Sequence, residues 1–230
     1  FLGGGGDGAD AAAVPNVPRV SGPAIPGLDT LPKRPAPTSV QGFRTMWDSQ
    51  IRPEHWGGAD VSLSVPMKDG RSVWLYGDTL SYKWGMQHST AIVQDGGNVR
   101  VANEGKQLLP NAPNTADGRK VLYWIEAAKE VAPNTLEVTA QETSVGTKNA
   151  WDFKRNKVNS RVATITVDEA GDMKFQGWKG WTKGPKLDYS LYPIPGKGAG
   201  YFAYSKQAHP QFKLDSGNVL HTYARNRDNL

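Results

Sequence analysis

The stretch HWGGADVSLSVPMKDGRSVWLYGDTLS, residues 55–81, decides the fold predicted for this chain. Two runs that favour strand, 61–66 and 71–76, flank the turn residues 68–70, so a β-hairpin is expected. Apolar and polar residues alternate in both runs, and a slip by one residue would set apolar side chains opposite polar ones. The alternation therefore predicts these pairs: Val65 with Val73, Leu63 with Leu75, Ser64 with Trp74, Ser62 with Tyr76, and Asp60 with Asp78.

The predicted register brings two aspartates together at the open end of this hairpin. Asp60 and Asp78 would have Cβ atoms about 5 Å apart if the strands still pair there. Like charges in facing positions destabilise a sheet, so a function would explain the pair. Trp74 and Tyr76 share their face, and carboxylates beside aromatic rings are typical of sites that cleave sugars. The alternative is that each aspartate caps a separate turn.

Composition excludes several classes of function. The 230 residues include 26 Gly and 16 Pro, which suits many short strands joined by turns. The chain has no cysteine, which excludes disulfides, Cys-ligated zinc and thiol catalysis. The four histidines have no metal-ligand spacing, so neither a metal nor another cofactor is expected. No stretch approaches the ~18 apolar residues of a membrane span, so no transmembrane segment is expected.

The net charge of +5 comes mostly from scattered residues. The densest basic cluster, residues 148–157, is interleaved with Trp151 and Phe153, a combination that nucleic-acid surfaces use. A solvated loop is the simpler explanation, so no nucleic-acid partner is expected. A basic face would also suit an anionic cell envelope.

The chain is expected to divide near residue 39. Residues 1–12 are rich in Gly and Ala, and residues 13–37 contain seven prolines. Residues 1–38 should therefore form a flexible arm or linker, ordered only by packing onto a partner. Residues 39–230 should form the compact domain. Its expected strands span 40–47, 59–66, 71–77, 89–94, 98–102, 119–129, 135–143, 159–167, 172–178, 200–206 and 218–224.

This series of short strands predicts an all-β sandwich, barrel or propeller. Hairpins begin near residues 59, 119, 159 and 200. These starts recur at intervals of roughly 40 residues with one wider gap, and such a spacing is typical of propeller blades. In a propeller, active sites gather at one mouth of the central channel, so side chains from other strands could join Asp60.

Several side chains are candidates for that mouth. Glu126, in YWIEAA, could be a general acid because aromatic surroundings can raise the pKa of a carboxyl; a solvent-facing strand residue is the alternative. His88 could bind a sugar hydroxyl, and so could His209, although a histidine before a proline is often structural. The remaining candidates for substrate binding, in the last expected strand, are Tyr223, Arg225 and Asn226.

No Gly-x-Ser-x-Gly elbow and no phosphate-binding loop is present in the sequence. Paired carboxylates therefore remain the strongest chemical signal. The reaction they suggest is glycoside hydrolysis, with one carboxyl as general acid and another as base or nucleophile.

The segment GADVSLSVPMKDGRSVWLYGDTLS, residues 58–81, resembles the opening blade of the bacterial endo-D-arabinanase family, glycoside hydrolase family 183. The family pattern has Gly-x-Asp at the start of a strand, then a hairpin containing Asp-Gly, then Gly-Asp-Thr. Asp60 and residues 77–79 match it, and GYFAYSKQAHP (200–210) and NVLHTYARNRDN (218–229) are similar in character. The resemblance implies a five-bladed β-propeller, compact or incomplete, with an extended N-terminal arm.

The resemblance also implies a substrate. It is the D-arabinofuranosyl chain of actinobacterial cell-wall arabinan, found in mycobacterial arabinogalactan and lipoarabinomannan, with Asp60 and Asp78 as the essential carboxylates. Such a protein would be extracellular or in the cell envelope. The alternative is a non-catalytic module that binds wall polysaccharide, such as a phage minor tail protein that docks on the host envelope. The arm 1–38 favours this alternative, because it could thread into other subunits of an envelope or virion tail assembly.

Overall fold

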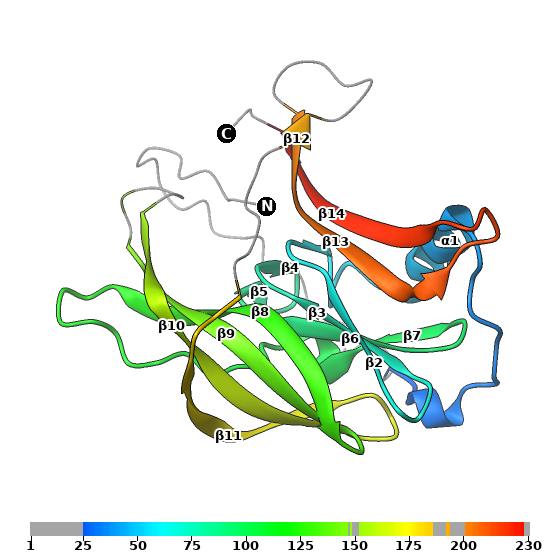
Figure 1. Cartoon of the computed structure of the whole chain (residues 1–230), viewed down its shortest axis with the longest axis horizontal. Coiled ribbons are helices and arrows are strands. Elements are labelled where there is room, and N and C mark those ends of the chain that lie inside the picture. Colours follow the sequence, from blue (N-terminus) through cyan, green and yellow to red (C-terminus); the bar gives the residue numbers. More distant parts are fainter. Residues whose placement is uncertain (1–24, 147, 149–151, 186–191, 194–200, 228–230) are drawn as a thin grey trace.

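The computed structural model describes residues 25–146, 148, 152–185, 192–193 and 201–227 (Figure 1). Most of these residues lie in antiparallel strands, so the all-β class predicted from the sequence is confirmed. The described strands form four separate sheets rather than a closed barrel or a complete propeller, so the number of blades stays a prediction. No helix in this part of the chain is long and apolar enough to cross a membrane.

The four sheets are named here by their strands. In spatial order they are β1 (Gly58–Ala59), β4 (Thr79–Ser81) and β5 (Gly85–Gln87); β2 (Leu63–Pro66), β3 (Ser72–Tyr76), β6 (Thr90–Asp95) and β7 (Asn98–Val101); β11 (Met173–Thr182), β10 (Phe153–Val167), β9 (Thr135–Val145) and β8 (Lys120–Ala132); and β12 (Tyr192–Pro193), β13 (Tyr201–Lys213) and β14 (Val219–Arg227). Two short 3-10 helices, η1 (Leu28–Thr30) and η2 (Ala102–Gly105), and one α-helix, α1 (Val40–Gln50), complete the described elements.

The register predicted for the first hairpin is confirmed. The pairs observed between β2 and β3 are Leu63–Leu75, Ser64–Trp74 and Val65–Val73. The same register continues into β1 and β4, and between them the N–H of Asp60 donates to the carbonyl of Asp78 at 2.9 Å. The two aspartates are therefore backbone partners, as the alternation of residues predicted.

The sheet β2–β3–β6–β7 is covered on both faces. Val73 and Leu75 face the main core, where they pack with Ile125 of β8. Trp74 and Tyr76 face a second core that includes residues of α1 and β14. Figure 1 shows α1 and the hairpin β13–β14 together on one side of the molecule and the sheet β8–β11 on another. All five residues of β3 are consequently buried.

The helix α1 (Val40–Gln50) occupies residues for which the sequence predicted a strand, 40–47, so that prediction is wrong. Ser39 is the N-cap, and its hydroxyl oxygen accepts the N–H three residues later at 3.0 Å. Phe43 and Met46 lie one turn apart and are both buried in the second core. The cap and this spacing favour a helix once a core is present to cover the two side chains.

Ser39→Ala is expected to lower the free energy of unfolding by about 1 kcal/mol, because one N–H of the first turn loses its acceptor. Urea denaturation measures the change, and Ser39→Asp should keep the wild-type value because aspartate also caps helices. Equal midpoints for Ser39→Ala and wild type would mean that this cap does not stabilise the protein.

Part of the segment predicted to be a flexible arm packs on the β-rich body. Leu28 is only 1% exposed and belongs to the main core. Further along, the N–H of Gly97 donates to the carbonyl of Arg34 at 2.9 Å. Arg100 Nη1 donates to the carbonyls of Ile25 and Pro26 at 2.6 and 2.7 Å. Residues 25–38 thus contribute contacts to the fold, and residues 1–24 lie outside the described part.

Candidate functional site

Asp60, Asp78 and His88 form one row across the sheet β1–β4–β5. Each lies one residue beyond a paired position of that sheet, so the three side chains continue its ladder. The N–H of Asp60 donates to the carbonyl of Asp78 at 2.9 Å, and Asp78 Oδ1 lies 2.8 Å from His88 Nδ1. We call these three residues the carboxylate row.

Backbone geometry fixes Asp60 tightly. The N–H of Asp78 donates to Oδ1 of Asp60 at 2.7 Å, where an unbroken ladder would use a backbone carbonyl. A Cβ at Gly77 would lie 2.6 Å from that oxygen, so the close approach requires glycine. Val61, which follows Asp60, has a φ of 49°, a left-handed conformation that a β-branched residue rarely adopts. Strain of this kind concentrates at active sites.

Burial and, to a smaller extent, the charge of Asp78 raise the pKa of the Asp60 carboxyl to about 6. Two hydrogen bonds oppose the rise, from the N–H of Asp78 and from the hydroxyl of Tyr204, which donates to Oδ2 at 3.4 Å. A carboxyl with such a pKa changes its protonation state near the pH at which most enzymes work. Asp60 can therefore donate or accept a proton in a reaction.

Asp78 has different surroundings. Its Oδ1 accepts a hydrogen bond from Nε1 of Trp124 at 2.8 Å and also contacts Nδ1 of His88. Both contacts orient the carboxyl through one oxygen, and no described side chain bonds to Oδ2. The two aspartates are thus neighbours in unlike environments, which is the usual arrangement when two carboxyls have different roles in one reaction.

Sequence reasoning missed Trp124 and Tyr204. They reach the row from β8 and β13, at sequence separations of 46 residues from Asp78 and 144 residues from Asp60. Ser205, directly after Tyr204, has a φ of 52°, and the pairing of β13 with β14 shifts register there. The motif YWIEAA, which contains the candidate acid Glu126, also contains Trp124 two residues earlier. This motif is the one sequence signal that could have pointed to Trp124.

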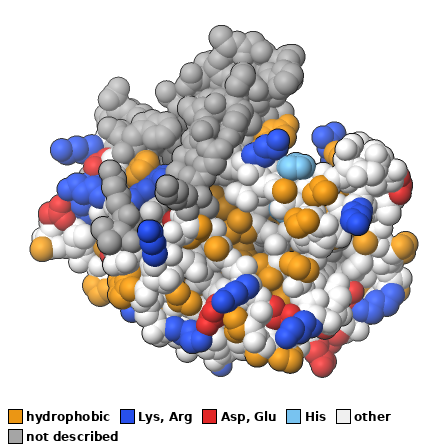
Figure 2. Space-filling view, in the orientation of Figure 1, with side chains coloured by type: hydrophobic (Ala, Val, Ile, Leu, Met, Phe, Trp, Pro, Cys, Tyr) orange, Lys and Arg blue, Asp and Glu red, His pale blue; other side chains and the backbone are white. Residues whose placement is uncertain are grey.

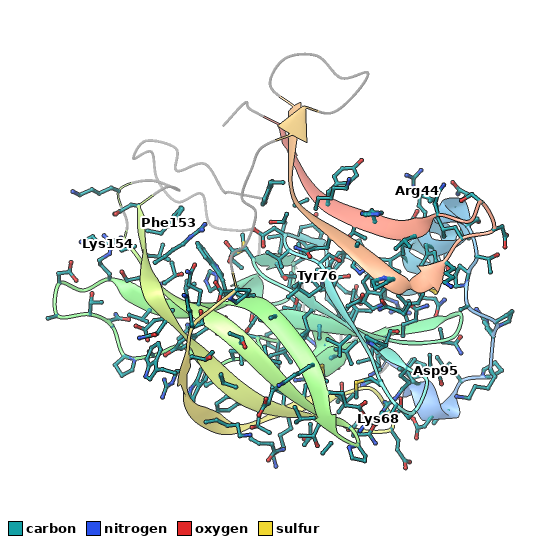
Figure 3. All side chains as sticks on the ribbon, in the orientation of Figure 1. Arg44, Lys68, Tyr76, Asp95, Phe153 and Lys154 are labelled. Carbon is teal, nitrogen blue, oxygen red and sulfur yellow. The ribbon has the colours of Figure 1, made fainter. Side chains whose placement is uncertain are left out.

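The Trp124 ring is itself held in place. The guanidinium of Arg155 lies 5.1 Å from its centroid, and Phe153 meets it edge-on at 5.4 Å. Figure 3 labels Phe153 at the start of β10 and Tyr76 near the centre of the molecule. The row is thus supported from the sheet β8–β11 on one side and from β13 on another.

Glu126, the sequence candidate for a general acid, is 4% exposed in β8. The hydroxyl of Ser160 donates to its Oε2, and burial raises the pKa of this carboxyl. No described contact joins Glu126 to either aspartate. The structure therefore brings His88 to the aspartate pair and leaves Glu126 in a separate buried group.

Trp74 and His209, sequence candidates for substrate binding, lie inside the fold at 1% and 0% exposure. The Trp74 ring stacks on Phe212, with centroids 5.2 Å apart. The His209 ring nitrogens lie 2.6 Å from the hydroxyls of Ser64 and Thr222, and burial lowers the pKa of His209 to about 4. Both rings contact other side chains of the fold and are almost fully covered, although Trp74 also lines the cleft between α1, β14 and the β2–β3 hairpin.

A cleft of about 320 Å³ lies between α1, β14 and the β2–β3 hairpin. Tyr76, which is buried, and Tyr223, which is 54% exposed, line it together with Val61, the residue after Asp60. Figure 2 shows several exposed hydrophobic side chains on the viewed face of the molecule. Neither aspartate lines this cleft, so it lies beside the carboxylate row rather than over it. The side chains of Arg225 and Asn226 lie outside the described residues.

No family model and no curated protein matches this chain. Among solved structures, one named "putative hydrolase" from Bacteroides ovatus ATCC 8483 is similar, with 15% sequence identity and a TM-score of 0.44. The similarity covers 79% of this chain, which spans 57% of that one. A likeness this distant assigns no activity to this chain.

Proposed function

We propose that this chain is a glycoside hydrolase that cleaves D-arabinofuranosyl linkages in actinobacterial cell-wall arabinan. The carboxylate row supports the proposal, because it sets two aspartates in unlike environments beside one another. The choice of arabinan rests on the resemblance of residues 58–81 to the endo-D-arabinanase family. Such a substrate would place the protein outside the cell or in its envelope.

In this proposal Asp60 takes the acid role for which the sequence suggested Glu126. Its Oδ1 is occupied by the N–H of Asp78, so the proton is carried on Oδ2 and passes to the glycosidic oxygen as the bond to the anomeric carbon breaks. Asp78 is oriented by Trp124 and His88. Its Oδ2 either attacks the anomeric carbon, after which water hydrolyses the glycosyl-enzyme and gives its proton back to Asp60, or takes the proton of a water that attacks that carbon directly. No metal or other cofactor has a role in these steps.

Incubation of the purified protein with arabinogalactan tests the proposal. New reducing ends and arabinose oligosaccharides should appear, whereas galactan and xylan should remain intact. If arabinogalactan is bound but no oligosaccharide is released, hydrolysis is wrong.

Trp124→Phe is expected to lower kcat on arabinan by about tenfold with little change in KM. Phenylalanine keeps an aromatic ring next to Arg155 but removes the N–H that orients Asp78, and hydrogen bonds to charged groups contribute about 1.5–3 kcal/mol. Steady-state kinetics measure the effect. Trp181→Phe, a half-exposed tryptophan of β11, is the matched control and should leave kcat unchanged. Equal kcat values for the two variants would mean that Trp124 does not orient Asp78.

The second candidate is a polysaccharide-binding module that does not cut its ligand, for example a tail protein that docks on a bacterial wall. The cleft beside the row favours it, because aromatic rings such as Tyr223 line a space that neither carboxylate enters. Retention on insoluble wall arabinan tests this candidate. A binding module should lose retention with Tyr223→Ala and should release no oligosaccharide.

A further inference from the structure

An outward face extends from the carboxylate row along β4. Burial alternates in this strand: Thr79 and Ser81 are 0% and 1% exposed, whereas Leu80 is half-buried. Residues two apart in a strand share a face, so Leu80 lies on the same side as Asp78. Tyr82, in the turn directly after β4, is 71% exposed, and its ring lies near Gly57, where an added Cβ would be 3.7 Å from Cε2. The buried side of β4 is thus fixed, and the opposite side, which carries Leu80, is partly exposed.

The ladder places a second row beside the first. Leu80 pairs with Gly58 of β1 and with Met86 of β5, so these three residues lie two positions from the carboxylate row. That offset corresponds to about 7 Å along the strands. Met86 is 38% exposed, and a Cβ at Gly58 would meet no atom within 4 Å. We call these three paired residues, Gly58, Leu80 and Met86, together with Tyr82 in the turn after β4, the apolar strip.

We propose that the apolar strip is a binding subsite for a sugar residue next to the cleaved bond of a neutral glycan. The inference rests on the proposed function, since it extends the carboxylate row along the same face of the same sheet. Its distance from the row, about two strand residues, matches the scale of one sugar ring. The C–H face of a sugar packs on apolar and aromatic groups, and the Tyr82 hydroxyl can bond to a sugar hydroxyl.

The charges around the strip favour a neutral ligand. Its four residues carry none. The neighbouring Lys83 pairs with Glu104, with 2.6 Å between Nζ and Oε2, and Lys106 lies 4.5 Å from the centroid of the Trp84 ring. An anionic chain would gain little from a cation that already has a partner. Single exposed apolar residues are normal on protein surfaces. Here, however, the two exposed residues Tyr82 and Met86 lie with Gly58, where an added Cβ would meet no atom within 4 Å, in a strip that ends at the two aspartates.

The double variant Tyr82→Ala/Met86→Ala tests the subsite. Its KM on arabinogalactan should rise about tenfold with kcat nearly unchanged, since the loss is in apolar contact with the chain rather than in proton transfer. Trp181→Ala is the matched control, because this tryptophan is 50% exposed on another sheet. Both variants should melt at the wild-type temperature, and the single variant Tyr82→Ala serves if the double variant does not fold.

Affinity for arabinogalactan is measured separately in an Asp78→Asn background, with and without the strip substitutions. Cleavage with an unchanged KM in the double variant would overturn the subsite and leave hydrolysis standing. If the wild-type protein binds arabinogalactan without cleaving it, and the strip substitutions weaken that binding, hydrolysis is wrong and the strip remains a glycan-binding site. If the Asp78→Asn protein has no affinity for arabinogalactan, galactan or xylan, the subsite is overturned as well.

Discussion

Asp60→Asn and Asp78→Asn are each expected to slow arabinan cleavage by about 10²–10⁴-fold, the contribution of a positioned acid or base. Asparagine has the shape of aspartate, and its oxygen can still accept the N–H of Asp78 or of the Trp124 indole. What it cannot do at these positions is carry the transferred proton or attack carbon. KM should change little, because the carboxylates act mainly on the transition state.

The pH dependence separates the two roles. If Asp60 is the acid, cleavage should fall as pH rises through about 6, because the proton to be donated is then lost. The residual activity of Asp60→Asn should not show that limb, whereas that of Asp78→Asn should retain one. Asp117→Asn, at an exposed turn, is the matched control and should behave as wild type. Wild-type rates in both site variants would mean that the reacting carboxylates lie elsewhere.

Alternation along the first hairpin was sufficient to predict the aspartate pair. In a strand, each correct pairing fixes all the others, so matching Leu63 to Leu75 also decided the position of Asp60 relative to Asp78. Only an irregularity in the backbone of one of the two strands could have moved the two aspartates out of register. Val61 is such an irregularity, because its backbone is left-handed. Asp60 nevertheless stays in register with Asp78.

Burial of the same hairpin could not be predicted from its sequence. The sequence placed Trp74 and Tyr76 on the face of the two aspartates, where their rings could stack on a sugar. In the structure that side is covered by α1 and the hairpin β13–β14. The sequence predicted a strand in place of α1, since Phe43 and its neighbours suit either structure, and the choice depends on the core that covers them.

The supporting residues of the site come from distant parts of the chain. Trp124 and Tyr204 contact the aspartates only because the first residues of β8 and β13 lie beside the sheet β1–β4–β5. No spacing in a single sequence records such a contact. His88, by contrast, could be named as a candidate from the sequence, because it follows the first hairpin closely. The short hairpin of β4 and β5 brings it back to Asp78.

Asp60→Asn is also expected to stabilise the protein, even though it removes activity. The rise in the pKa of this carboxyl from its ordinary value of 3.8 to about 6 means that the folded state disfavours its charge. At pH 7 that difference amounts to about 3 kcal/mol of lost stability. An uncharged asparagine of the same shape avoids the cost, so the free energy of unfolding should rise by up to about this amount.

The sign of the effect fixes its pH dependence. Because the folded state holds the proton more tightly than the unfolded chain, protonated Asp60 costs nothing below about pH 4. The stability difference between variant and wild type should therefore be small at pH 4, grow as pH rises to about 6, and stay constant above it. Urea denaturation at pH 4, 5, 6 and 7 measures this difference, with Asp48→Asn, at an exposed aspartate of α1, as the control.

The shape of that curve decides between two explanations of any gain. A gain equal at every pH would come from packing or hydrogen bonding at the new side chain, not from removal of a charge. A loss at pH 7 would mean that the Asp60 carboxylate stabilises the fold, as a turn-capping aspartate would. The predicted curve, together with loss of cleavage, would show that the fold tolerates a destabilising charge at the position where the proposed reaction needs a proton.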